Sequence, residues 1–197
     1  MEQDGNLILT FWCYHGTLAE SAEKIMQSKE FLYKWNSTHW LGNGIYFFVD
    51  DFAKAKWWSR ECARNIYKET GLKPATACIR VKVNTSKKDL LNLDTESDCR
   101  ILEKYTEDFR QKLSSVTLKD RDITLTTQQI RTMVFDYLVK NNGYKAIKHT
   151  FSNTKITYQN INKGLSPKNE QYLRNNGTQL AIFDQSLIDF KTLIICN

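Results

Sequence analysis

The sequence has no long apolar run, few prolines and glycines, and no closely spaced pair of cysteines. No stretch of its 197 residues approaches the roughly 20 apolar residues that span a bilayer, and residues 1–6 are polar and acidic, unlike a signal peptide. We therefore expect a cytoplasmic protein without a membrane partner. The five cysteines are scattered and form no CxxC pair, so we expect free thiols, no disulfide framework and no bound metal.

Marks of a domain boundary and of a phosphate-binding loop are missing as well. Only two prolines and eight glycines occur, and no Ser/Gly-rich linker interrupts the chain, so we expect a single domain over residues 1–197. The GxGxxG and GxxxxGKS/T motifs are absent, which argues against Rossmann and P-loop nucleotide sites. A hydrophobic content of 41% with 25% charged residues excludes a disordered chain.

Positive charge is in excess, and the excess is local. The net charge is +6, and residues 121–197 carry ten basic side chains against five acidic ones. Within them, residues 140–179 hold seven basic side chains and one acidic one, which makes this segment a candidate surface for an anionic partner. Residues 150–178 are rich in Asn, Thr, Ser and Lys, and this composition predicts a long exposed loop.

Hydrophobic periodicity predicts strands and helices without a regular βαβ alternation. Residues 75–83 alternate apolar and polar side chains, as in a strand with one buried face. Two helices are expected to begin with capping boxes, at Thr17 with Glu20 and at Thr126 with Gln129. This mixture favours an α+β fold with antiparallel sheets. Further strands are expected at residues 7–14, 45–49, 144–149, 178–183 and 190–196, and further helices at 52–66 and 102–113.

Two short motifs contain the residues best suited to catalysis or ligand binding. His15, Gly16 and Thr17 lie where the first strand meets the first helix, so the imidazole can be directed toward a ligand that approaches the glycine backbone. Residues 42–47 read Gly-Asn-Gly-Ile-Tyr-Phe, in which two glycines precede a strongly β-forming run. His15 and Tyr46 are 31 residues apart, with one predicted helix between them.

In this order and spacing the two motifs resemble those of the ADP-ribosyltransferase superfamily. The resemblance is to its His-Tyr-Glu branch, which includes diphtheria-like toxins and the poly(ADP-ribose) polymerases, and it extends over most of the chain except residues 85–125. It implies a split β-sandwich of two antiparallel sheets with flanking helices. NAD, as co-substrate, would bind in the cleft between the sheets.

The resemblance also implies a role for each matching residue. His15 would hydrogen-bond the ribose next to the adenine, Gly16 would offer backbone groups to the nicotinamide carboxamide, and Thr17 would contact the nicotinamide-side ribose. Tyr46 would stack on the nicotinamide ring. In many relatives an aromatic residue eleven positions later covers the other ring face, and here that position holds Trp57. The alternative is that Trp57 packs against another layer of the protein.

The third motif of the branch departs from its usual pattern. The superfamily glutamate at the start of a late strand falls on Gln179. A glutamine keeps the hydrogen bonds to the ribose but loses the charge that stabilises the oxocarbenium-like centre, a contribution of about 3 kcal/mol. Three interpretations stay open: a working His-Tyr-Gln set, a contribution from Glu170, or loss of catalysis with NAD or ADP-ribose binding retained.

Function is expected to follow from these residues and from the basic segment before Gln179. We expect transfer of a single ADP-ribose unit to RNA or single-stranded DNA, because cations hold phosphates and aromatic rings stack bases. Such an enzyme would suit a toxin or antiphage effector, with a neutralising antitoxin as partner. Alternatives are a protein acceptor, an NAD glycohydrolase, a silent binding domain and an ordinary solvated loop. His39 and His149 are interpreted as structural. The candidate target-recognition residues are Lys155, Tyr158, Lys163, Lys168, Glu170, Tyr172 and Arg174.

Overall fold

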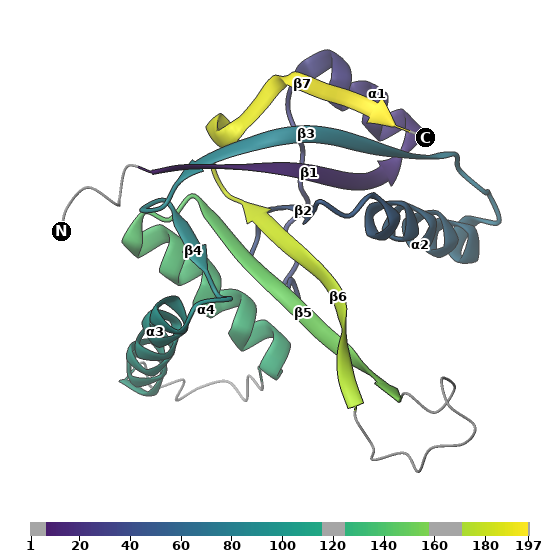
Figure 1. Ribbon diagram of the computed structural model, residues 1–197. Helices are drawn as coiled ribbons and strands as arrows, with labels where there is room; N and C mark the ends of the chain where they lie inside the picture. The colour runs from purple at the N-terminus through teal and green to yellow at the C-terminus, as the bar shows by residue number, and fades with distance from the viewer. Residues whose placement is uncertain (1–6, 116–124, 158–170, 197) are drawn as a thin grey trace, which may run out of the picture.

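A seven-stranded sheet and four helices make up the part of the chain that the structure describes (Figure 1). The computed structural model describes residues 7–115, 125–157 and 171–196. In chain order the elements are β1 (Ile8–Leu18), α1 (Ala19–Ser28), β2 (Ile45–Val49), α2 (Phe52–Thr70), β3 (Thr76–Ser86), β4 (Leu90–Asn92), α3 (Glu96–Ser115), α4 (Thr127–Asn142), β5 (Ala146–Thr157), β6 (Gln171–Ile182), the short 3-10 helix η2 (Gln185–Leu187) and β7 (Ile188–Cys196).

The strands are arranged in the order β4-β5-β6-β2-β1-β3-β7. β1 pairs with β3 along its whole length, but its recorded pairing with β2 is limited to Cys13↔Val49 and Tyr14↔Phe48. This short ladder joins two strand groups, β1-β3-β7 and β2-β6-β5-β4, which cross at a wide angle in Figure 1. The α+β class is confirmed. We expected two antiparallel sheets, whereas the strands form one continuous sheet in which β4 and β5 run parallel.

One core cluster draws residues from all seven strands and from α1. In β3 the apolar side chains of the predicted period-two pattern, such as Ile79, Val81 and Val83, are buried in this cluster, and Cys78 is buried on the opposite face. Neighbouring residues of β2 point to opposite faces of the sheet, so Phe47 belongs to this cluster and Phe48 to a second one beneath α2. The β-forming run after the two glycines therefore packs against both layers.

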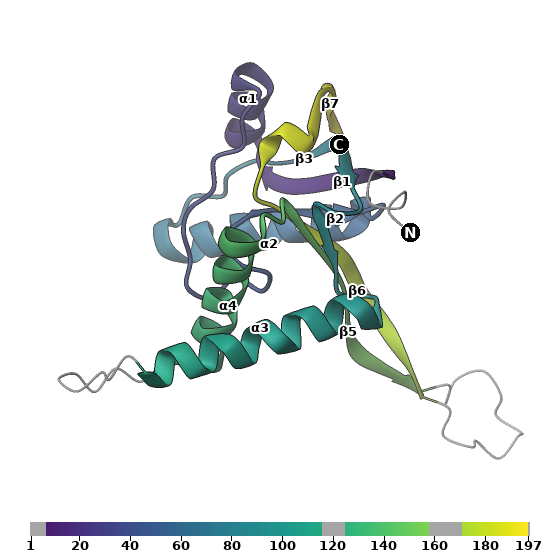
Figure 2. The same cartoon turned by 90° about the vertical axis from the view of Figure 1, so that its left-hand side faces the viewer.

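Helices cover the two faces of the sheet unequally. α1 packs on the Phe47 face through Ala22 and Ile25. α2 packs on the opposite face, where Ala55 contacts the cluster around Phe48, and α4 covers the β4-β5-β6 part of the same face with Phe135. Figure 2 shows α1 well separated from α3 and α4. Residues on the Phe48 face thus lie between α2 on one side and α4 on the other.

One of the two predicted capping boxes is wrong. β1 continues through Thr17, which pairs with Ala77 of β3, and α1 begins only at Ala19. Because strand pairing fixes the Thr17 backbone, its side chain does not cap the helix, and Glu20 bonds Lys24 one turn later. The box at Thr126 and Gln129 is confirmed. Asp51 caps α2 by accepting a hydrogen bond from the Lys54 backbone amide.

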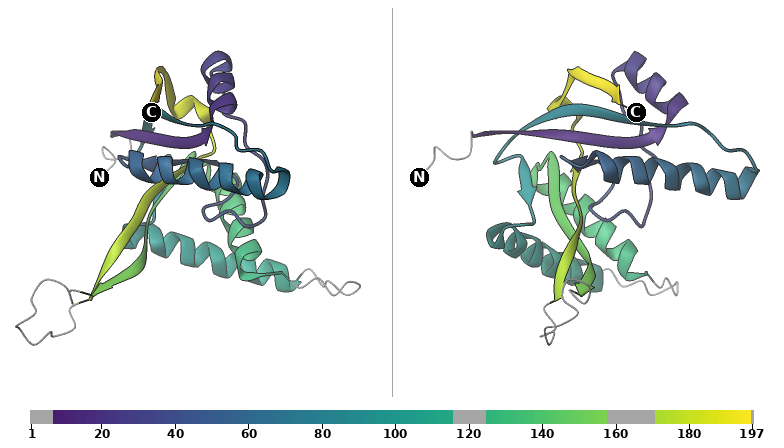
Figure 3. Two further views of the ribbon diagram at one scale, coloured as in Figure 1. Left: turned by 90° about the vertical axis from the view of Figure 1, so that its right-hand side faces the viewer. Right: turned by 45° about the vertical axis from the view of Figure 1, so that its right-hand side comes forward.

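The prediction of a long loop over residues 150–178 is also wrong for part of that segment. β5 continues to Thr157 and β6 begins at Gln171, so both ends of the segment are paired strands. The two strands project from the body as a ribbon in Figures 1 and 3. The sequence signal for a strand is the apolar alternation of a face packed on a core, and residues 150–157 and 171–178 lack that alternation.

All five cysteines are free thiols, of which Cys13 and Cys78 are buried. Free thiols were expected from their scattered positions. Among residues 7–115, 125–157 and 171–196, no helix has the length and apolar character needed to cross a membrane.

Candidate functional site

The two sequence motifs meet where β1 and β2 separate. His15 in β1 lies one residue beyond the last recorded β1–β2 pair, Tyr14↔Phe48. Its Nδ1 atom is 2.8 Å from the backbone oxygen of Tyr46 in β2. Beyond the Tyr14↔Phe48 pair, the contact between β1 and β2 is therefore made by the His15 imidazole and the Tyr46 carbonyl.

The backbone of Gly16 is directed toward the same separation. The amide of Asp50 donates to the carbonyl of Trp12, at 2.9 Å, so the backbone groups of Trp12 lie on the β2 side of β1. In a strand the backbone groups of every second residue lie on the same side. Those of Gly16 therefore also lie on the β2 side, at the level of Tyr46, beyond the end of the recorded ladder.

The hydrogen bond to Tyr46 sets the protonation of His15. A carbonyl oxygen only accepts, so Nδ1 carries the proton and Nε2 is free to accept a hydrogen bond from a ligand. The ring packs at centroid distances of 5.3 Å from Phe31 and 5.6 Å from Phe47. Burial lowers the pKa of His15, and the opposing effect of the hydrogen bond is smaller. The imidazole is therefore neutral at neutral pH.

Folding stability should consequently depend on the protonation of His15. Because its pKa is lower in the folded protein, the unfolded chain binds more protons once the pH falls below about 6.5, the ordinary value for histidine. The free energy of unfolding should decrease as the pH falls from 6.5, and this dependence should be weaker in His15→Gln. Urea titrations of both proteins at a series of pH values measure it. Equal slopes for the two proteins would contradict a partly buried, neutral imidazole.

Tyr46 projects from the face of the sheet opposite to His15. Its hydroxyl donates to the Gly42 carbonyl at 2.8 Å and accepts from the Leu41 amide at 2.7 Å, so the turn before β2 holds it in place. The ring lies 5.3 Å from that of His39. Burial raises the pKa of Tyr46 well above its ordinary value, so the hydroxyl stays protonated.

Gln179 lies on the Tyr46 face, one strand away. It pairs directly with Phe48 of β2, and the next pair of this ladder on the same face, two positions along, joins Tyr46 to Ala181. Tyr46 and Gln179 are therefore diagonal neighbours on one face, and Gln179 is half-buried. On its other side Gln179 pairs with His149 of β5.

For Thr17 and Trp57, the other predicted NAD-contacting residues, the structure gives no contact with Tyr46 or Gln179. Thr17 is half-buried at the end of β1, on the His15 face. Trp57 is 51% exposed on α2, away from the buried face of that helix, as its helical position predicts. Its recorded ring contacts are with Trp58, at 6.1 Å, and the Lys54 amine, at 5.9 Å. The role of Trp57 opposite Tyr46 stays a prediction.

The predicted target-recognition residues are only partly placed. In the projecting ribbon, Lys155 pairs with Leu173, Ile156 with Tyr172, and Thr154 with Arg174. Three basic or aromatic candidates and the carboxylate proposed to replace the superfamily glutamate lie outside the described residues. These are Tyr158, Lys163, Lys168 and Glu170.

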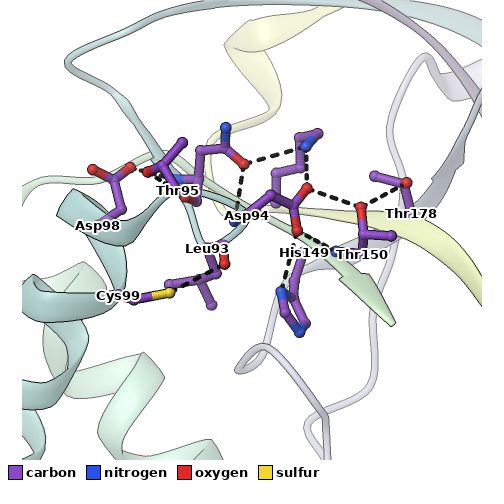
Figure 4. Close-up of polar contacts among 10 residues, drawn as sticks. Leu93, Asp94, Thr95, Asp98, Cys99, His149, Thr150 and Thr178 are labelled. Atoms are coloured by element: carbon purple, nitrogen blue, oxygen red, sulfur yellow. Dashed lines mark hydrogen bonds and ion pairs between the residues drawn. The ribbon is translucent and has the colours of Figure 1, made fainter. Parts of the chain in front are cut away.

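A polar network beside Gln179 was not found from the sequence (Figure 4). Asp94, just after β4, receives hydrogen bonds from Lys148 and Thr150 of β5 and lies close to His149. Its position depends on the parallel pairing of β4 with β5, for which the sequence carries no local signal. The pairing of His149 with Gln179 likewise depends on a register between distant strands.

Comparison with known proteins adds a relative without an assigned activity. No protein-family model matches the chain. The chain is similar to an uncharacterized protein of Methanocaldococcus jannaschii, with 35% identity over 129 residues. The match covers 65% of this chain and 56% of the relative, so the chain spans about half the length of the relative that it matches.

Proposed function

We propose that this chain is a NAD-dependent mono-ADP-ribosyltransferase of the His-Tyr-Glu type, with Gln179 in the position of the glutamate. The observation that carries the proposal is the contact of His15 Nδ1 with the Tyr46 carbonyl, at 2.8 Å, where β1 and β2 separate. The His15 ring thus contacts the backbone of the second motif, while the Tyr46 side chain lies on the other face of the sheet, together with Gln179. The backbone of Gly16 is directed toward the same place.

The arrangement of the strands supports the same proposal. A split β-sandwich needs two antiparallel strand groups that separate next to the first motif. Here β1-β3-β7 and β2-β6-β5 are antiparallel groups, and the ladder between them is recorded at only two residue pairs. We infer that this sheet is a variant of that sandwich, with β4 added in parallel at one edge.

The chemistry follows from where charge develops during the reaction. The bond between the ribose C1′ and the nicotinamide nitrogen breaks, nicotinamide leaves with the electron pair, and a nucleophile of the acceptor bonds to C1′. Neutral His15 can accept a hydrogen bond from the adenine-side ribose through Nε2, and Tyr46 offers a ring face to the nicotinamide. Gln179 can hold the ribose hydroxyl but cannot neutralise the cation, so we expect a slow enzyme.

Nucleic acid is the proposed acceptor because of charge. The ribbon that leads to Gln179 belongs to the segment of residues 140–179, in which basic residues outnumber the single acidic one. Lys155 and Arg174 belong to β5 and β6 of this ribbon, and lysine and arginine are the residue types that neutralise phosphates. Modification of nucleic acid would harm the cell that makes the enzyme, as expected of a toxin or antiphage effector.

An assay with NAD tagged on the adenine tests the proposal. Purified protein is offered total RNA, single-stranded DNA and lysate protein in parallel, and both nicotinamide release and label transfer are measured. We expect label on a nucleic acid, at least about tenfold less label with His15→Ala or Gln179→Ala, and no change with Gln128→Ala, an exposed glutamine on α4.

The other outcomes identify different functions. Label on protein alone would overturn the nucleic-acid acceptor and leave the transferase. Nicotinamide release without label would indicate a glycohydrolase. A rise of melting temperature with NAD, in the absence of nicotinamide release, would replace the enzyme by a binding domain.

A further inference from the structure

His149 lies directly beside the predicted catalytic glutamine. It faces Gln179 across the β5–β6 ladder, and directly opposed residues of antiparallel strands share a face with their Cβ atoms about 5 Å apart. Phe48 occupies the other side of Gln179, in β2. A ribose held by the Gln179 side chain would therefore have an imidazole next to it. The side chain of His149 is 35% exposed, so it is accessible from solvent.

Asp94 is positioned to orient this imidazole. Its Oδ1 atom lies 3.4 Å from His149 Nδ1, a buried nitrogen for which the described residues supply no hydrogen bond, so Asp94 acts on it through charge and proximity (Figure 4). The same oxygen accepts from the Thr150 amide at 2.7 Å, and Oδ2 accepts from the Thr150 hydroxyl at 2.8 Å and from the Lys148 amine. The Thr150 hydroxyl is in turn 2.9 Å from that of Thr178, the residue before Gln179. The carboxylate is thus fixed by several groups.

The carboxylate stays ionised although it is partly buried. Burial raises the pKa of Asp94, but the hydrogen bonds from Lys148 and Thr150 outweigh that effect and lower it. A negative charge at this point favours a proton on Nδ1 of His149, which leaves Nε2, on the far side of the ring from Asp94, with its lone pair. The centroids of the His149 and Phe151 rings are 4.6 Å apart in a T-shaped arrangement, which limits the rotation of the imidazole.

We propose that His149, oriented by Asp94, is the general base that deprotonates the acceptor beside Gln179. This inference rests on the proposed transferase function and supplies what Gln179 lacks, because an amide cannot take up a proton. As the C1′–nicotinamide bond breaks, an acceptor hydroxyl bonds to C1′ and passes its proton to Nε2. Asp94 stabilises the resulting imidazolium, which returns the proton to water.

Few charged groups face His149 in the described structure. Asp94 faces it from the segment after β4, and Lys148, on its own strand, is bound to Asp94. On the side of α4, the guanidinium of Arg131 lies 5.5 Å from the ring of Trp40, which packs 4.8 Å from Phe151. Among the described residues, the charged group nearest to His149 is therefore the Asp94 carboxylate.

The test compares label transfer, nicotinamide release and NAD affinity in the full chain. We expect His149→Gln to reduce transfer about 100-fold without a change in the melting-temperature shift that NAD produces. Asp94→Asn should show a smaller loss, and Glu103→Gln, an exposed carboxylate on α3, should show none.

Chemical rescue separates catalysis from structure. Imidazole added to His149→Ala should restore part of the transfer, which a merely structural role of His149 would not allow. A His149→Gln variant that keeps the wild-type rate of transfer would overturn the inference alone. A wild-type protein that does not release nicotinamide from NAD would overturn the proposed function as well, so the two failures are distinguishable.

Discussion

Replacement of Gly16 by alanine should lower the free energy of unfolding by more than about 3 kcal/mol. A Cβ atom on Gly16 would lie 1.9 Å from the backbone oxygen of Ala55 and 3.0 Å from the backbone nitrogen of Ser59, both in α2. These are atoms of a helix backbone that packs on β1, so the whole helix would have to move. The effect is measured by urea denaturation, or by the yield of folded protein where the variant does not fold.

Two further variants make the Gly16→Ala result interpretable. Ala55→Gly should not rescue it, because the atom in the way belongs to the backbone and not to the Ala55 side chain. Gly71→Ala should cost less, about 1–2 kcal/mol, because the added Cβ meets nothing within 4 Å and only the positive φ of 73° opposes it. An unfolding midpoint of Gly16→Ala equal to that of the wild type would show that α2 does not sit on β1 as described.

The parts of the fold that the sequence predicted are those with strong local patterns. β2 was expected at residues 45–49 and is found there, since a β-forming run follows two glycines. The buried side chains of β3 follow from its alternation. Thr126 caps α4 as predicted because no strand competes for its backbone, whereas Thr17 is held by its pairing with Ala77. Two similar capping signals thus had different outcomes because strand pairing involves only one of them.

The candidate site was predicted as a set of residues rather than as a geometry. The motifs identified His15 and Tyr46, but their contact depends on where the β1–β2 ladder ends, which is a property of the whole sheet. The same holds for His149, which we interpreted as structural because nothing near it in the sequence suggests a partner. Only the register of β5 with β6 brings it to Gln179, and only the β4–β5 pairing brings Asp94 to it.

The turn that carries Tyr46 is secured from α4 by one carboxylate. Asp136 accepts hydrogen bonds from both the backbone amide and the side-chain amide of Asn43, each at 2.6 Å. Asn43 is buried, and its side-chain oxygen accepts in turn from the Asn36 amide at 2.8 Å. Between Asn43 and Tyr46, the chain enters β2. Loss of this carboxylate would therefore leave two buried donors without an acceptor.

Asp136→Ala should lower the free energy of unfolding by about 3 kcal/mol, because each bond to a charged acceptor contributes about 1.5 kcal/mol or more. Asp136→Asn keeps one acceptor oxygen and should lose about half as much. Glu103→Ala, an exposed carboxylate on α3, should change the midpoint of urea denaturation very little. Since the Tyr46 hydroxyl is bound to Leu41 and Gly42 of the same turn, Asp136→Ala should also reduce the melting-temperature shift that NAD produces. Equal stability of Asp136→Ala and Glu103→Ala would mean that the turn holds its shape without α4.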